Sequence, residues 1–149
     1  DALQPGGKSK DVIIVGYGAS QLEDILVRKL KKFGKYIRPD PEPEKGFFYR
    51  SDHISLSKKG VPTLYADAGF DKVDGGVEAG QRLAERYTRE DYHQSSDEYN
   101  PNWDLSGIVE QLSITAEIVL DLANSLNWPE WYEGNEFRSI REESRSSSQ

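Results

Sequence analysis

Apolar residues in this chain occur in short runs and helical stripes that are separated by polar turns. Residues 12–15, Val-Ile-Ile-Val, are four consecutive β-branched residues between Asp11 and Gly16. A continuous run of this kind is typical of a strand that is buried on both faces of a sheet. Apolar residues at helical spacing follow over residues 20–34, which open with a capping-box pattern and end at a glycine. We therefore expect a central strand followed by an amphipathic helix of about four turns.

Further elements continue the alternation of strands and helices. Tyr36 and Ile37 predict a short strand, and the prolines at 39, 41 and 43 predict a stiff extended connection. Ser51 is the expected N-cap of the next helix, with Ile54 and Leu56 pointing inward. Residues 61–66 read as another buried strand. This succession predicts an α/β layered fold.

The second half of the chain is less regular. Periodicity fails over residues 67–91, which contain four glycines, and predicts a long functional or mobile loop. Asp104 is the expected cap of a helix that reaches about Leu126 and is apolar around most of its circumference, so we expect it to be heavily buried. The Trp128–Trp131 segment is expected to pack back on the domain, whereas the chain from Arg138 onward is expected to be frayed or disordered. We predict one domain over residues 1–141 and a disordered tail over residues 142–149.

Composition excludes several classes of protein. The chain has 149 residues, a net charge of −7 and no cysteine, so it offers neither a basic surface for nucleic acid nor a thiolate metal site. No apolar run approaches the roughly 20 residues that span a bilayer. The chain also contains no methionine, and we expect it to be a processed or truncated piece of a longer protein.

Two polar stretches carry candidate chemistry. Residues 92–98, Tyr-His-Gln-Ser-Ser-Asp-Glu, place an imidazole beside a phenol and before a carboxylate, which suits a metal ligand with a hydrogen-bond donor next to it. Residues 47–53, Phe-Phe-Tyr-Arg-Ser-Asp-His, combine aromatic and charged groups at an expected helix start. The alternatives are structural: His93 could be a solvated surface residue, Asp97 could cap the turn before Pro101, and Asp52 could serve only the helix start.

The order of several short motifs resembles a known family. The motifs are Tyr-Arg-Ser-Asp-His at 49–53, Gly-Val-Pro at 60–62, Asp-Tyr-His-Gln-Ser-Ser-Asp-Glu at 91–98, Trp-Asp-Leu-Ser-Gly at 103–107 and Trp-Pro-Glu-Trp at 128–131. Together they resemble the C-terminal part of the di-zinc peptidases of metallopeptidase family 28, which include bacterial leucyl aminopeptidases and the glutamate carboxypeptidase type. The resemblance implies a mixed, mostly parallel sheet flanked by helices in a three-layer sandwich.

The resemblance also implies a metal centre. Two zinc ions about 3.5 to 4 Å apart would share a carboxylate and a bridging water. His93 matches the last ligand of the family, and Asp1 matches the ligand before it. By the same resemblance, the phenol of Tyr92 would donate a hydrogen bond to the tetrahedral oxyanion, although Tyr92 could instead only pack. Asp97 would act as a second-shell group near His93.

The remaining implications concern the substrate and the rest of the protein. Asp52 and His53 match a motif that lines the substrate pocket in relatives. The first His, the bridging Asp and two consecutive glutamates of the family lie upstream of Asp1, so this chain would hold at most two of five zinc ligands and no general base. We therefore expect a secreted or periplasmic aminopeptidase whose peptide substrate is cleaved only with the N-terminal half of the same domain. Neither nucleic acid nor a membrane span is expected.

Two other interpretations stay open at this point. In one, the same fold serves as a non-catalytic binding or structural module that needs no metal. In the other, this piece stays associated with an N-terminal piece after a nick in the chain. An exposed sheet edge and an uncovered apolar face would be expected in that case.

Overall fold

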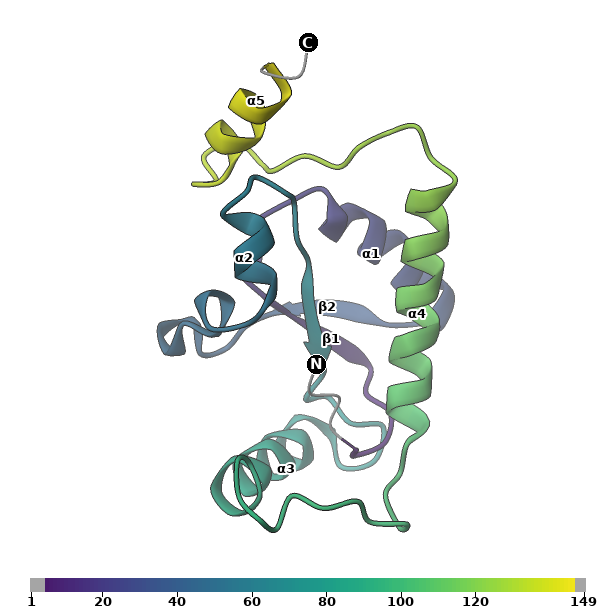
Figure 1. Ribbon diagram of the computed structural model, residues 1–149. Helices are drawn as coiled ribbons and strands as arrows, with labels where there is room; N and C mark the ends of the chain where they lie inside the picture. The colour runs from purple at the N-terminus through teal and green to yellow at the C-terminus, as the bar shows by residue number, and fades with distance from the viewer. Residues whose placement is uncertain (1–4, 147–149) are drawn as a thin grey trace.

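A mixed three-stranded sheet forms the centre of the molecule. Figure 1 shows a computed structural model, which describes residues 5–146. Strand β1 (Asp11–Val15) lies between β2 (Tyr36–Pro39) and β3 (Tyr65–Ala68). The β1–β2 pair is parallel and the β1–β3 pair is antiparallel. With helices flanking this mixed sheet, the predicted α/β fold is confirmed.

The strand β1 is central because its side chains are apolar on both faces of the sheet. All five of its residues are buried, as the run of β-branched residues predicts. Val12 and Ile14 pack against helices α1 (Leu22–Leu30) and α4 (Ser106–Ala123). The main core is therefore one layer thick between the sheet and these two helices, which lie side by side (Figure 1). Its buried members are Val12, Ile14, Leu26, Leu30, Ile114 and Ile118.

The predicted signals flank helix α1, although the helix is shorter than the predicted segment and its N-cap residue is Gln21 rather than Ser20. The carboxylate of Glu23 accepts hydrogen bonds from the backbone N–H groups of Gly18 (2.9 Å) and Ala19 (2.7 Å), which precede the helix. The hydroxyl of Ser20 accepts a longer one, 3.4 Å, from the N–H of Leu22. After α1, the short 3₁₀ helix η1 (Lys31–Phe33) ends at Gly34, whose φ of 64° lies in the left-handed region. The capping-box and glycine signals are confirmed.

The expected long loop over residues 67–91 is wrong. The strand β3 extends to Ala68, and a helix, α3 (Gly76–Glu90), follows it. The helix escaped prediction because its apolar stripe is narrow and because Gly80 reads as a breaker. In the structure Gly80 serves close packing, since a Cβ there would lie 2.1 Å from the carbonyl oxygen of Phe70.

Boundaries near the short helix α2 (His53–Ser57) also differ from the prediction. Asp52 rather than Ser51 is the N-cap residue, and Leu56 is 55% exposed, whereas Ile54 is buried as expected. The strand that was predicted at residues 61–66 is formed instead by Tyr65–Ala68. The approach to it is held by side chains, because the carbonyl of Thr63 accepts a bond from the Ser20 hydroxyl.

Helix α4 is less buried than its composition predicts. The N-cap residue is Leu105 rather than the predicted Asp104, whose carboxylate accepts a hydrogen bond of 2.9 Å from the N–H of Ser106. The helix ends at Ala123 instead of near Leu126. Only its inner face meets the sheet and α1 within the described part of the chain. Its outer face leaves large apolar side chains more than half exposed, namely Val109, Leu112, Val119 and Leu120.

The C-terminal segment returns across the domain and ends in a helix. Trp131 is 2% exposed and donates its indole N–H to the carbonyl of Gly60 at 3.0 Å, so the packing predicted for this segment is confirmed for Trp131, whereas Trp128 stays exposed. Helix α5 (Arg138–Ser146) occupies residues where a disordered chain was predicted, so that prediction is wrong for 138–146. An ion pair within the helix, Arg138 to Glu142 at 2.8 Å, supports it where apolar residues are few.

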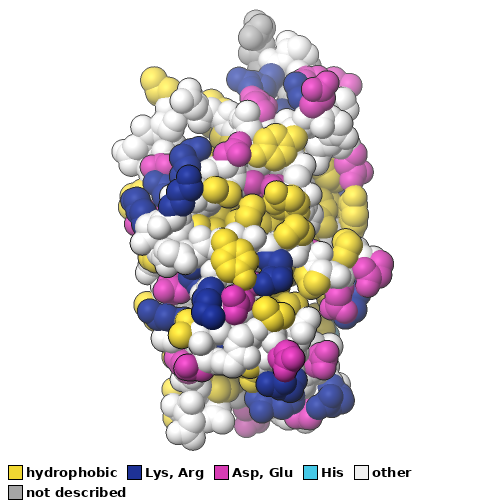
Figure 2. Space-filling view, turned by 180° about the vertical axis from the view of Figure 1, so that it is seen from behind, with side chains coloured by type: hydrophobic (Ala, Val, Ile, Leu, Met, Phe, Trp, Pro, Cys, Tyr) yellow, Lys and Arg dark blue, Asp and Glu magenta, His cyan; other side chains and the backbone are white. Residues whose placement is uncertain are grey.

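The surface seen from behind carries mixed side chains. Apolar groups lie there between basic and acidic ones, and neither sign of charge dominates this face (Figure 2). Across residues 5–146 no helix has both the length and the apolar character needed to cross a bilayer.

Candidate functional site

An aromatic wall surrounds His53 at the first position of α2. The His53 ring lies 4.6 Å from the ring of Phe48 and 5.4 Å from that of Tyr65, both in edge-to-face contacts. Phe48 belongs to the 3₁₀ helix η3 (Phe47–Tyr49), which follows a similar turn, η2 (Pro43–Lys45). Three separate elements, η3, α2 and β3, therefore meet at one imidazole. We call these three side chains the His53 wall.

The electrostatics of His53 favour the neutral imidazole. Burial lowers its pKa below the ordinary value, and the neighbouring carboxylate of Asp52 opposes this shift. Within the described residues, Nε2 of His53 is buried and has no hydrogen-bond partner. A buried ring nitrogen without a partner is costly, so a bound ligand that completes this hydrogen bond would be favoured.

The position of Phe48 depends on a glycine in the loop after β1. Gly16 has a φ of 77°, and a Cβ at this residue would lie 2.3 Å from the Phe48 ring. Residues with a side chain rarely adopt this conformation, and any Cβ here would collide with the ring. The end of the central strand is thus shaped to receive one side of the His53 wall.

The Tyr92–His93 pair lies in the turn after α3 and is exposed. The two rings stack with their centroids 3.9 Å apart and their planes at 21°, and Tyr92 is 44% exposed. His93 has a φ of 60°. Among the described residues, no other non-glycine residue has a positive φ. This left-handed conformation costs roughly 1–2 kcal/mol for a side chain with a Cβ. Such strain is concentrated at functional sites, and it favours a functional role for His93 over that of a solvated surface residue.

Asp97 was expected to act near His93, but in the structure its side chain contacts helix α3. Its carboxylate accepts a hydrogen bond of 2.9 Å from the hydroxyl of Tyr87, a residue of α3. The Tyr87 ring also lies 6.0 Å from that of Tyr92. Asp97 therefore ties the turn to α3, and its role beside His93 stays a prediction.

Two residues of strand β3, Tyr65 and Asp67, lie at the candidate site and were not among the predicted site residues. Tyr65 and Asp67 point to the same face of the sheet because side chains alternate along a strand. The pKa of each is raised, chiefly by burial; Asp67 contributes to the shift of Tyr65, and Tyr92 does so to a smaller extent. Tyr65 thus contacts His53 directly. An aromatic residue and a carboxyl at alternate positions of a strand were the available signal.

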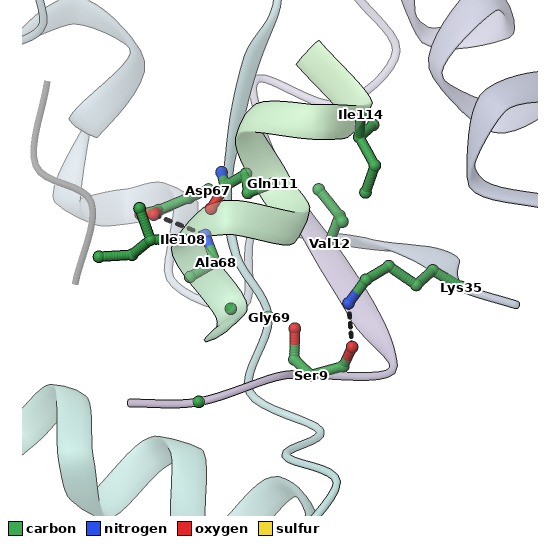
Figure 3. A pocket seen from close by; sticks show the side chains of 11 residues that line it. Ser9, Val12, Lys35, Asp67, Ala68, Gly69, Ile108, Gln111 and Ile114 are labelled. Carbon is green, nitrogen blue, oxygen red and sulfur yellow. Dashed lines mark hydrogen bonds between the residues drawn. The ribbon is translucent and has the colours of Figure 1, made fainter. Parts of the chain in front are cut away.

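A small cavity on the α4 side of β3 has no room for a substrate. It measures about 20 Å³, the space of a single water molecule, and lies between β1, β3 and the first half of α4 (Figure 3). Polar groups along it already have partners: the amide of Gln111 donates to the carbonyl of Ala66 at 2.9 Å, and Lys35 donates to the carbonyl of Ser9. This cavity therefore belongs to the packing of α4.

The predicted site residues are only partly brought together. Asp52 is exposed at the N-cap of α2 but makes no side-chain capping bond, so the helix start alone does not explain it. Asp1 lies outside the described residues. Among residues 5–146 no three His, Cys, Asp or Glu side chains are grouped so that they could hold a metal ion. The described residues therefore do not form a zinc site by themselves.

Comparison with known proteins identifies the family. Searches of curated proteins and of solved structures returned no match. The family model of Peptidase family M28 matches residues 1–116, which include both the His53 wall and the Tyr92–His93 turn. This match covers well over half of the chain and agrees with the order of the short motifs. The chain belongs to peptidase family M28.

Proposed function

We propose that the chain is the C-terminal part of the catalytic domain of a zinc-dependent aminopeptidase. The observation that carries this proposal is the family match over a segment in which a strained histidine stacks on a tyrosine. Bound zinc would supply an activated water for peptide hydrolysis. The same resemblance supports export from the cell.

The Tyr92–His93 turn and the His53 wall have distinct roles in this proposal. His93 would hold a metal ion together with Asp1 and with ligands outside this chain, because an exposed imidazole keeps both ring nitrogens accessible. The phenol of Tyr92 would donate a hydrogen bond to negative charge that develops on the substrate. The His53 wall and Asp52 receive the substrate: a neutral imidazole between two aromatic rings suits an uncharged part of a peptide.

The surface of α4 supports an additional part of the domain. Val109, Leu112 and Val119 lie on its outer face, and each is at least half exposed. Monomeric proteins rarely leave a contiguous apolar stripe of this size in water. We propose that the N-terminal half of the catalytic domain covers this face and supplies the general base and the remaining ligands, so that the chain alone is inert.

Peptidase assays test this proposal. The 149-residue chain and the complete protein, with the sequence that precedes Asp1, are each purified with their metal content measured and are assayed on aminoacyl anilides. We expect about two zinc ions and hydrolysis in the complete protein only. Replacing Leu112 with Ser should leave the isolated chain folded but should destabilise the complete protein, whereas Ser113→Ala serves as the control on the same helix.

The alternative function, a non-catalytic module of the same fold, has a different outcome. A complete protein that binds no zinc and hydrolyses no peptide would overturn the enzyme proposal and favour the module. Activity of the isolated chain would overturn the claim that the site is divided.

A further inference from the structure

The last part of the chain packs against the back of the His53 wall. Residues 127–146, here called the C-terminal strap, lie beyond the end of the family match at residue 116. The strap returns from the end of α4 toward α5 (Figure 1) and pairs with the loop after β1 through Ser20 and Trp131. The Phe137 side chain of the strap then contacts Phe48 of η3. In η3 the strap contacts Phe48, whose ring packs on His53, and the neighbouring Tyr49.

The strap is fixed to the body of the domain at two points. The N–H of Tyr132 donates to the carbonyl of Ala19 at 2.9 Å, and the N–H of Gln21 donates to the carbonyl of Glu130 at 2.9 Å. At the other end of α2, the buried Trp131 donates its indole N–H to Gly60. These bonds fix the strap to the turn before α1 and to the turn after α2, and the buried indole of Trp131 adds packing to the second of these contacts.

From this support two side chains reach η3. The ring of Phe137 stacks on that of Phe48, with centroids 6.4 Å apart and planes at 28°. The carboxylate of Glu136 accepts a hydrogen bond of 2.6 Å from the hydroxyl of Tyr49. Phe48 is consequently held between Gly16 on one side and Phe137 on another, with its edge-to-face contact directed at His53.

We propose that the C-terminal strap is a positioning element for the His53 wall: through Phe137 and Glu136 it clamps η3, so that Phe48 is held against the imidazole of His53. His53 and Phe48 touch the substrate in the proposed function, whereas the strap acts only through them. The identity of the ligand rests on the proposed function, whereas the clamp rests only on the contacts described above.

Titration of the two histidines in the full 149-residue chain tests the clamp. The chain contains two histidines, so imidazole carbon-bound proton signals in NMR spectra report each ring separately. In Glu136→Ala the Tyr49 bond is lost and η3 loosens. Water then reaches His53, and its titration midpoint should move up toward the ordinary histidine value.

Matched variants separate the clamp from a general loss of structure. Glu136→Gln keeps an oxygen that accepts the Tyr49 bond and should restore the midpoint of His53, while Glu133→Ala removes another exposed carboxylate of the strap and should change nothing. Phe137→Ala should give a larger shift than Glu136→Ala. Identical His53 midpoints in the original chain and in a folded Glu136→Ala variant would overturn the proposal, even if Phe137→Ala fails to fold.

The complete protein supplies a second readout. There Glu136→Ala should raise KM by about 3- to 10-fold with kcat changed by no more than about twofold, because a loosened wall weakens substrate binding without touching the reacting groups. A fall in kcat at constant KM would contradict a positioning role in the substrate wall. If the complete protein has no peptidase activity, the proposed function fails, while the histidine titration still decides whether the strap acts on His53.

Discussion

The His53 wall and the Tyr92–His93 turn are built in opposite ways. His53 is half-buried, it contacts two aromatic rings, and a chain of packing extends behind it through Phe48 and Phe137 to Trp131. His93 stacks on a single ring at the surface and has a strained backbone. One imidazole is therefore supported by this chain alone, whereas the other is held in an unfavourable conformation with few supporting contacts.

This difference bears on the proposed division of the catalytic domain. A strained and exposed residue is retained where a bound group or a neighbouring segment compensates for its cost. His53 needs no such segment to keep its place, because the strap and η3 already provide it. The comparison is consistent with the proposal that His53 contributes to substrate binding and that His93 needs groups outside this chain to hold a metal ion.

The largest effect is expected from the packing behind His53. Trp131→Ala should lower the free energy of unfolding by about 3–5 kcal/mol, the usual cost of deleting a buried tryptophan. Trp131→Phe, which loses mainly the bond to Gly60, should cost about 1–2 kcal/mol. Urea unfolding of the 149-residue chain measures both, with exposed Trp128→Ala as the control. Equal midpoints for Trp131→Ala and Trp128→Ala would contradict the buried role of Trp131.

Activity should distinguish the two imidazoles next. In the complete protein His93→Ala should lower kcat/KM by about 100-fold or more, equivalent to about 2.7 kcal/mol of transition-state stabilisation. His53→Ala should lower it only about 10-fold, and mainly through KM, because His53 contributes to binding. Steady-state kinetics and zinc content check this pair, and Gln94→Ala controls for changes in the turn. A larger loss of kcat/KM for His53→Ala than for His93→Ala would reverse the roles assigned to the two histidines.

A pair of glycines in one loop gives a smaller and sharper test. Gly16 and Gly18 have φ values of 77° and 88°, but a Cβ would meet the Phe48 ring only at Gly16. Both alanine variants should lose about 1 kcal/mol for the left-handed backbone. Gly16→Ala should lose about 1–3 kcal/mol more because the ring must move. Thermal unfolding measures this difference, which would vanish if Phe48 did not lie on Gly16.

The smallest effect is expected at the exposed turn. Tyr87→Phe removes the hydrogen bond to Asp97 and should destabilise the chain by about 0.5–1 kcal/mol. Hydrogen exchange at the amides of residues 92–97 should become faster, while the amides of α2 should be unaffected. Tyr99→Phe, at a residue that is 73% exposed, is the matched control. Unchanged exchange in Tyr87→Phe would show that Asp97 does not hold the turn.

Local patterns were sufficient to predict the first half of the fold. The run Val12–Val15 and the stripe of α1 carry their own periodicity, and Glu23 and Gly34 mark the ends of the helical segment. Helix α3 was missed because Gly80 is required by a neighbour, Phe70, whose proximity no local pattern reveals. Helix α5 was missed because charged side chains rather than an apolar face stabilise it.

The candidate site was predictable only where its residues are close in sequence. Tyr92 and His93 are neighbours, and their polar surroundings marked them as candidates. The contact between His53 and Tyr65 depends on the path from α2 into β3, and the support from Phe137 depends on the return of the strap. These contacts are set by the fold of the whole chain, so residue types and spacing could not indicate them.

The cover that α4 gives to the sheet has a consequence for how the protein is made. Ile114 and Ile118 pack on Val12 and Ile14 of β1, but they follow the end of β2 by about 75 residues. At about 5–20 residues per second, a ribosome needs roughly 4 to 15 s to add that length. During this interval the apolar residues of β1 and α1 are already made, but the helix that covers them is not. Chaperone binding and aggregation during synthesis should therefore be most pronounced before α4 emerges.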